Sequence, residues 1–186
     1  YAPGLNAKLQ RRLELESDLR QAIQRGELHL HYQPQVEVDT GAITGVETLL
    51  RWYHPRLGII PPAEFIPLAE ETGLIIPMGE WVLRQACAQG QLWEAAGLPP
   101  FTIAVNLSAR QFADRAFLDT VMRVLQDTGL DPKWLELEIT ESQVMRQTDG
   151  MILLLNRLAE MGVHLAIDDF GTGYSSLSYL KRLPIQ

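Results

Sequence analysis

The chain has 186 residues, 46% of them hydrophobic, which is enough apolar material for one globular domain with a packed core. Its formal net charge of −7, without any Lys/Arg-rich block, argues against DNA binding, and no apolar run is long enough to cross a bilayer. We find no signal peptide and expect a cytoplasmic domain without membrane contact, whose longer parent could be anchored through other domains. The one cysteine, Cys87, excludes an internal disulfide, and its helical context predicts a small buried apolar side chain.

The first half of the chain predicts a helix, a hairpin and a loop. Leucines recur among Arg, Glu and Gln over residues 7–25, which is typical of an amphipathic helix, and a glycine ends it. Two alternating runs, 28–36 and 43–52, flank an Asp-Thr-Gly turn and predict an antiparallel hairpin. The Pro- and Gly-rich stretch 54–67 predicts a long ordered loop, followed by a short helix over 67–72.

The second half alternates strictly between helices and strands. The predicted segments are a helix over 79–96, a strand over 101–107, a helix over 108–127, a strand over 134–139, a helix over 142–161, a strand that begins at 163, and a helix over 177–183. Such alternation predicts an α/β fold with parallel strands and crossover helices. No G-x-G-x-x-G turn follows an early strand, which disfavours a dinucleotide-binding sheet. With about five strands, we predict a (β/α)8 TIM-like barrel truncated about three units before completion.

The last predicted strand ends on two adjacent acids, Asp168 and Asp169. Successive strand residues point to opposite faces, so both carboxylates can serve one site only where the strand ends and the backbone turns. Gly171 and Gly173 supply such a turn, and serines follow where a helix should begin. This is the end of a β/α unit at which barrel enzymes place their chemistry. A solvated turn with a capping aspartate is the alternative.

Each predicted strand from the second to the fifth ends on a side chain that carries oxygen. These residues are Glu47, Asn106, Glu138, and the pair Asp168 and Asp169. Carboxylates with one amide suit a hard cation such as Mg²⁺ or Mn²⁺, and two such ions could clamp a phosphate and activate a water. Glu136 shares a strand face with Glu138, and the two would repel unless a cation or proton compensates. Taken singly, each acid could equally be an exposed or capping carboxylate, and Arg51 could be either a phosphate ligand or a surface arginine.

Six motifs, found in order along nearly the whole chain, resemble those of the EAL family of cyclic di-GMP phosphodiesterases. They are Y-Q-P at 32–34, E-T-L-L-R-W at 47–52, F-I-P-L-A-E-E-T-G at 65–73, V-N-L-S at 105–108, E-I-T-E at 138–141 and D-D-F-G-T-G-Y-S-S-L at 168–177. The resemblance implies a (β/α)8 barrel with one antiparallel strand. It also implies hydrolysis of the bacterial messenger cyclic di-GMP to linear pGpG with Mg²⁺ or Mn²⁺, and a homodimer through the EAL domains.

The resemblance also implies residue roles. Metal ligands would be Glu47, Asn106, Glu138 and Asp168, with Asp169 on a second metal. Glu141 would hold the D-F-G-T-G loop in place, and substrate contacts would be Gln33, Leu50 and Arg51. Residues 1–26 resemble the connector that follows a GGDEF domain in tandem GGDEF–EAL proteins, so we expect a GGDEF or sensory domain in the parent and an EAL barrel domain over 27–186.

The sequence departs from the family pattern at two places. Thr48 replaces the alanine of the motif that names the family. The chain also ends at Gln186, where the family usually has aspartate, and before a family lysine and a further metal-binding glutamate. We therefore expect a fragment, or the recorded part of a longer protein, that does not turn over substrate by itself.

Two functions remain open from the sequence. The first is a phosphodiesterase, and the second is a catalytically silent receptor or regulatory module for cyclic di-GMP. The acidic residues discriminate between them, because receptors of the family commonly lose acids that this chain keeps. A kinase is rejected, since the D-F-G triplet has no H-R-D or V-A-I-K partner.

Overall fold

The computed structural model describes residues 3–141, 149–168 and 184. The described elements are α1 (Pro3–Ala22), β1 (Leu28–Val36), β2 (Ile43–His54), β3 (Gly58–Ile60), α2 (Pro62–Thr72), α3 (Ile75–Ala95), β4 (Thr102–Asn106), α4 (Ala109–Phe112), α5 (Phe117–Thr128), the short 3-10 helix η1 (Pro132–Trp134), β5 (Leu135–Thr140), α7 (Asp149–Glu160) and β6 (His164–Asp168). The predicted α/β alternation is therefore confirmed over this part of the chain. None of the described helices is long and apolar enough to cross a membrane.

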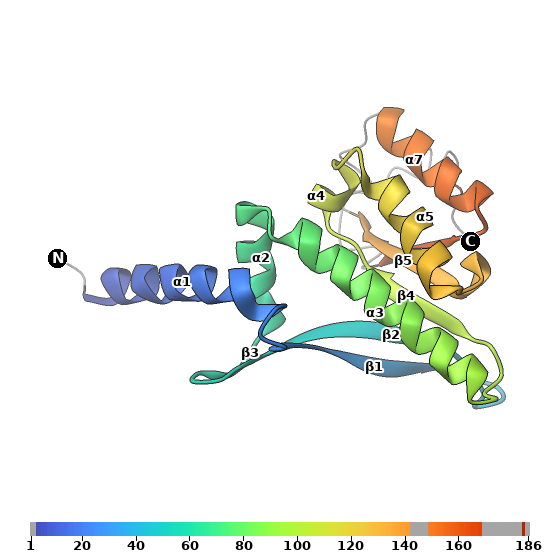
Figure 1. Ribbon diagram of the computed structural model, residues 1–186, viewed down its shortest axis with the longest axis horizontal. Coiled ribbons are helices and arrows are strands. Elements are labelled where there is room, and N and C mark those ends of the chain that lie inside the picture. Colours follow the sequence, from blue (N-terminus) through green and yellow to red (C-terminus); the bar gives the residue numbers. More distant parts are fainter. Residues whose placement is uncertain (1–2, 142–148, 169–183, 185–186) are drawn as a thin grey trace.

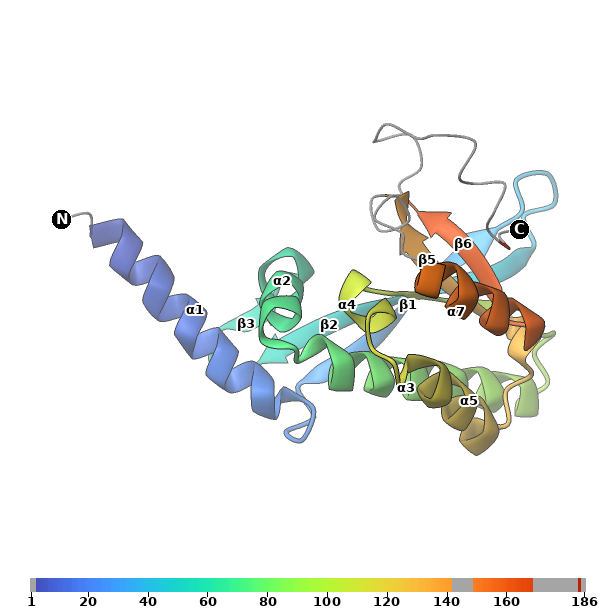
Figure 2. The ribbon, with the colours of Figure 1, turned by 90° about the horizontal axis from the view of Figure 1, so that it is seen from above.

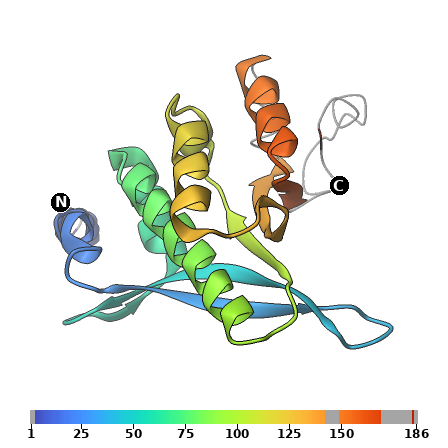
Figure 3. The same cartoon turned by 45° about the vertical axis from the view of Figure 1, so that its right-hand side comes forward.

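The strands form one sheet in the order β1-β2-β4-β5-β6, with β3 paired to β2 (Figure 1). Strands β1 and β2 are antiparallel, whereas β2, β4, β5 and β6 are parallel. The predicted hairpin and the predicted parallel strands are both confirmed. Helices α3, α5 and α7 lie side by side over one face of the sheet (Figure 3). Parallel strands that alternate with helices are typical of a TIM-like barrel, and β1 and β3 are antiparallel additions to this pattern.

The helix-covered face of the sheet forms the main hydrophobic core. Alternate residues of three parallel strands are buried there, namely Ile103 and Val105 of β4, Leu135, Leu137 and Ile139 of β5, and Leu165 of β6. Helix α3 comes close to β4 because Gly90 has no side chain, and a Cβ at that position would collide with Ile103. Cys87 is fully buried in this core, and burial raises the pKa of its thiol to about 12, as expected for an inert apolar side chain.

A second cluster attaches α1 to the rest of the domain. Leu15, Leu19 and Ala22 of α1 are buried together with Trp52 of β2 and Phe65 of α2. The N-terminal part of the helix extends past α2 (Figure 2). The predicted connector helix is thus packed into the fold through its C-terminal half.

Three predicted boundaries were wrong. The stretch predicted as a loop over 54–67 contains β3 and the beginning of α2, and Pro67 lies inside that helix rather than at its start. Buried Phe65, Leu68 and Ala69 hold α2 against the second cluster, so tertiary packing outweighs the local effect of the proline. Helix α3 begins at Ile75 instead of Gly79. The single helix expected over 108–127 is divided into α4 and α5.

Candidate active site

The sheet register brings the predicted acids to one face. Glu47 is in register with Ala104, Asn106 with Glu138, and Thr140 with Asp168. Side chains two residues apart on a strand point to the same face, so Glu47, Asn106, Glu138 and Asp168 share the face opposite the helices. Asn106, Glu138 and Asp168 lie at or near the carboxyl ends of their strands, as predicted. Glu47 lies in the middle of β2, so the prediction that this strand ends near Glu47 was wrong.

One hydrogen bond joins two of these residues directly. The Asn106 side-chain amide donates to Glu47 Oε1 at 2.9 Å. This bond links the middle of β2 to the end of β4 and leaves the amide oxygen of Asn106 available as a ligand. Asn106 and Asp168 are exposed, whereas Glu47 and Glu138 are half-buried.

The electrostatics of the face centre on Glu138. Burial, together with the negative charges of Glu47, Glu136 and Asp168, raises the pKa of its carboxyl to about 7. Burial also raises the pKa of Glu136, against the opposing effect of His164. Like charges that crowd a half-buried carboxylate favour either its protonation or a bound cation.

The donor set fits a hard divalent cation. Carboxylate and amide oxygens are the ligands that Mg²⁺ and Mn²⁺ prefer, and the excess negative charge around Glu138 would be compensated by such an ion. Over residues 3–141 and 149–168, no three His, Cys, Asp or Glu side chains lie close enough together to hold a metal. Asp169, the remaining predicted ligand, lies outside the described residues. The ligand roles therefore stay predictions.

The predicted substrate contacts lie on both faces of β1 and β2. Gln33 is exposed and pairs across the hairpin with Glu47, on the same face. Arg51 also belongs to this face; it donates to the backbone oxygen of Leu50, and no described carboxylate lies within ion-pair distance of it. Leu50 points to the opposite face and packs against both hydrophobic clusters. A direct contact of Leu50 with substrate stays a prediction, as do those of Gln33 and Arg51.

Glu141 directly follows β5 and is only 4% exposed. A buried carboxylate at the end of a strand needs partners, and Glu141 has one. The D-F-G-T-G loop that it was predicted to hold lies outside the described residues, so this role remains a prediction.

Sequence reasoning overlooked a group of exposed rings on the face that carries Glu47. His29 and His31 of β1 both contact Tyr53 of β2 there. Part of the signal was available, because His29 and His31 alternate in phase with Gln33 along the first predicted strand. Tyr53 lies one residue beyond the predicted end of the second strand.

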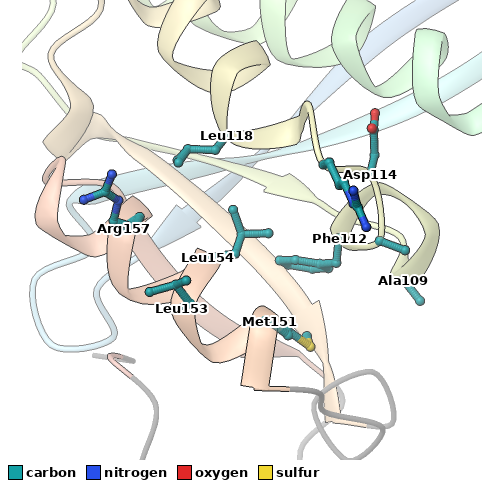
Figure 4. A pocket seen from close by; sticks show the side chains of 11 residues that line it. Ala109, Phe112, Asp114, Leu118, Met151, Leu153, Leu154 and Arg157 are labelled. Carbon is teal, nitrogen blue, oxygen red and sulfur yellow. The ribbon is translucent and has the colours of Figure 1, made fainter.

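A separate groove of about 860 Å³ runs between α4, the start of α5, and α7 (Figure 4). Phe112, Leu118, Met151 and Leu154 line it together with Arg157. Of the predicted site residues that the structure describes, none lines it, so we assign no part of the site to this groove.

Comparison with known proteins identifies the family of the chain. The EAL domain family matches residues 16–186. The chain is 53% identical over 184 residues to the bifunctional diguanylate cyclase/cyclic di-GMP phosphodiesterase MucR of Pseudomonas aeruginosa, covering 99% of this chain and 27% of that protein. It is 44% identical over 185 residues to the cyclic di-GMP phosphodiesterase NbdA of the same organism, covering 100% of this chain and 23% of that protein.

Solved structures of EAL proteins align with most of this chain. The structure of the PaMucR phosphodiesterase in complex with c-di-GMP aligns with a TM-score of 0.90 and 54% identity, over 93% of this chain and 70% of that chain. The FimX EAL domain from Pseudomonas aeruginosa bound to c-di-GMP aligns with a TM-score of 0.83 and 26% identity, over 92% and 69% of the respective chains. The chain spans about a quarter of the length of the curated relatives that it matches. The chain belongs to the EAL domain family.

Proposed function

We propose that the protein containing this chain hydrolyses cyclic di-GMP to linear pGpG with Mg²⁺ or Mn²⁺. The observation that carries the proposal is the shared face of Glu47, Asn106, Glu138 and Asp168, with like charges concentrated at Glu138. Relatives named as cyclic di-GMP phosphodiesterases, and an EAL structure in complex with c-di-GMP, support the substrate.

Each residue has a proposed task. Glu47, Asn106, Glu138, Asp168 and Asp169 would hold the cation or cation pair, and Glu141 would fix the neighbouring loop. The metal, when bound, supplies charge for the phosphodiester oxygens and lowers the pKa of an attacking water. Arg51, which lacks a carboxylate partner among the described residues, binds a substrate phosphate. Gln33, exposed across from Glu47, donates a hydrogen bond to the substrate.

We also propose a cytoplasmic homodimer that contains a GGDEF or sensory domain beside the EAL domain. The substrate is a bacterial second messenger, and MucR, named as bifunctional, combines diguanylate cyclase with phosphodiesterase activity. The division into a connector over 1–26 and a domain over 27–186 is part of this proposal. The packing of Leu15 and Leu19 against α2 suits a connector that is fixed to the domain.

The test is incubation of the protein that contains this chain with cyclic di-GMP and Mg²⁺, with pGpG measured by chromatography. We expect product that disappears on addition of a chelator and in the Glu47→Gln variant, which keeps the size of the side chain and loses its charge. The receptor alternative predicts binding of cyclic di-GMP by calorimetry without any pGpG. Absence of both binding and product would reject the proposal altogether.

A further inference from the structure

The turn that follows Asn106 is held in place by several contacts. Strand β4 ends at Asn106, and the backbone N–H of Leu107 donates to the backbone oxygen of Glu138 on β5 at 2.9 Å. Ser108 then caps α4, because its hydroxyl accepts the backbone N–H of Gln111 at 3.3 Å while its own backbone N–H donates to Gln111 Oε1 at 3.1 Å. This reciprocal pair closes the chain into a fixed turn two residues after Asn106.

The side chain of Gln111 also reaches α3. It is only 4% exposed and lies against Gly79. A Cβ at Gly79 would be 2.0 Å from Gln111 Nε2 and 2.6 Å from its Cδ, so the glycine leaves the space that the amide occupies. Burial of an amide costs hydration that an apolar side chain in the same space would not lose. What the amide adds here is therefore its hydrogen bond with Ser108.

A second side chain ties α4 to α2. Arg110 donates to the backbone oxygens of Glu70 and Glu71 near the end of α2, to the latter at 3.1 Å. The last carbonyl groups of a helix have no partner within the helix, and a guanidinium can satisfy them. Helix α4 is thus attached to two neighbours, to α3 through Gln111 and to α2 through Arg110.

These contacts act on a residue of the candidate active site. Asn106 directly precedes the anchored turn, and its amide donates to Glu47 Oε1 at 2.9 Å. The position of that amide depends on the direction in which the backbone leaves β4, and the pair of Ser108 and Gln111 fixes this direction. We propose that Gln111 is a positioning residue for the metal site. Through Ser108 it holds Asn106 in the orientation in which the amide donates to Glu47 and leaves its oxygen available as a ligand. This inference rests on the proposed function.

The test separates positioning from packing. In the protein that contains this chain, Mn²⁺ affinity is measured by electron paramagnetic resonance of the free ion, and stability by thermal unfolding. Gln111→Ala removes the acceptor for Ser108 and the packing against Gly79, so Mn²⁺ affinity should fall about 10–100-fold and stability should decrease. The double variant Gly79→Ala/Gln111→Ala fills the vacated space with a methyl group and should recover stability, while its Mn²⁺ affinity should remain low. Gln111→Glu keeps the acceptor oxygen of the capping box and should retain most of the affinity.

Gln91→Ala is the matched control, because Gln91 of α3 also makes a side-chain hydrogen bond three residues along the chain, to Glu94 at 2.9 Å, and belongs to no part of the candidate site. Native Mn²⁺ affinity in Gln111→Ala would overturn the proposal. Recovery of affinity together with stability in the double variant would also overturn it, since Gln111 would then only fill space.

A crystal structure of metal-free Gln111→Ala gives a readout that depends on neither metal nor substrate. We expect the hydrogen bond from Asn106 to Glu47 to be lost there, and its persistence would likewise overturn the proposal. If the native protein neither binds Mn²⁺ nor hydrolyses cyclic di-GMP, the proposed function fails separately, and this structure still decides whether Gln111 positions Asn106.

Discussion

The amide of Asn106 donates a 2.9 Å hydrogen bond to Glu47, although the two residues are 59 positions apart in the chain. The bond joins the middle of β2 to the end of β4, and the parallel register of these strands places Glu47 beside Ala104. It fixes one carboxylate oxygen of Glu47 and turns the amide oxygen of Asn106 away from the donated bond. Both side chains are thereby oriented before any ligand arrives, which is how preorganised sites are built.

Loss of this bond should weaken metal-dependent activity. In Asn106→Ala, Glu47 loses its orienting donor and the site loses an oxygen ligand, so we expect hydrolysis of cyclic di-GMP to fall at least about 10–100-fold. The Mg²⁺ concentration for half-maximal rate should rise in parallel. The measurement is initial rate against Mg²⁺ concentration, with Asn156→Ala on α7 as the matched control. Native metal dependence in Asn106→Ala would remove Asn106 from the site.

Arg51 should contribute to affinity more than the surface arginines do. Arg51→Ala removes a guanidinium that no described carboxylate neutralises, and we expect binding of cyclic di-GMP to weaken about 10–100-fold, as for loss of a charge-assisted contact. Arg51→Lys should recover only part of this loss, because an ammonium group cannot bind a phosphate in the bidentate way. Isothermal titration calorimetry provides the affinities. Arg123→Ala, which breaks an exposed ion pair with Glu80, is the control and should bind normally. Equal affinities for Arg51→Ala and the control would contradict the assignment.

The sequence was sufficient for the described strands other than β3 and for the face that carries the acids. Period-two alternation predicted β1 at 28–36 as it is found, and placed Glu136 and Glu138 on one face. Both inferences depend only on local geometry, which a strand transmits along its length. The pairing of Asn106 with Glu47 could not be predicted in this way, because it depends on the register between strands 59 residues apart.

Tertiary contacts account for the features that were predicted wrongly or not predicted at all. Pro67 suggested a helix start, but the burial of Phe65 and Leu68 on both sides of it keeps α2 continuous. A capping box at Ser108 and Gln111 begins α4, and between α4 and α5 the side chain of Asp114 accepts the backbone N–H of Ala116. The contacts of His29 and His31 with Tyr53 were overlooked because these residues become neighbours only when the hairpin forms.

Replacement of Thr48 should stabilise the domain without altering catalysis. Thr48 is 3% exposed, and its hydroxyl has no hydrogen-bond partner among the described residues. Thr48→Val keeps the shape and removes the unsatisfied hydroxyl, so we expect the free energy of unfolding to rise by about 1–2 kcal/mol. Activity should stay unchanged, because Thr48 points away from the face of Glu47. Thermal unfolding checks the first expectation and pGpG production the second. Thr48→Ser, which retains the hydroxyl and loses the methyl group, should be less stable than the native protein.

The attachment of α1 should weaken in acid through Asp18. Asp18 of α1 accepts a hydrogen bond from His54 Nε2 at 2.9 Å, while His54 Nδ1 accepts the backbone N–H groups of Arg56 and Leu57. The Nδ1 contacts therefore place the imidazole proton on Nε2, aimed at the carboxylate. This hydrogen bond lowers the pKa of Asp18 below its usual 3.8, against the opposing effect of burial.

A carboxyl whose pKa is lower in the folded state stabilises the fold above its unfolded pKa and loses that contribution as the pH falls through the folded value. Asp18→Asn keeps an acceptor for His54 and removes the charge. We expect this variant to be less stable than the native protein at neutral pH, and the difference to shrink as the pH falls below about 4 and Asp18 itself becomes protonated. Urea unfolding at a series of pH values, followed by tryptophan fluorescence, measures the difference, and Trp52 contacts the His54 ring directly.

Glu16→Gln on the same helix removes an exposed i,i+4 pair with Arg20 and should show a much smaller change. A stability difference for Asp18→Asn that stays constant from neutral pH to pH 3 would show that the charge of Asp18 does not hold α1 in place.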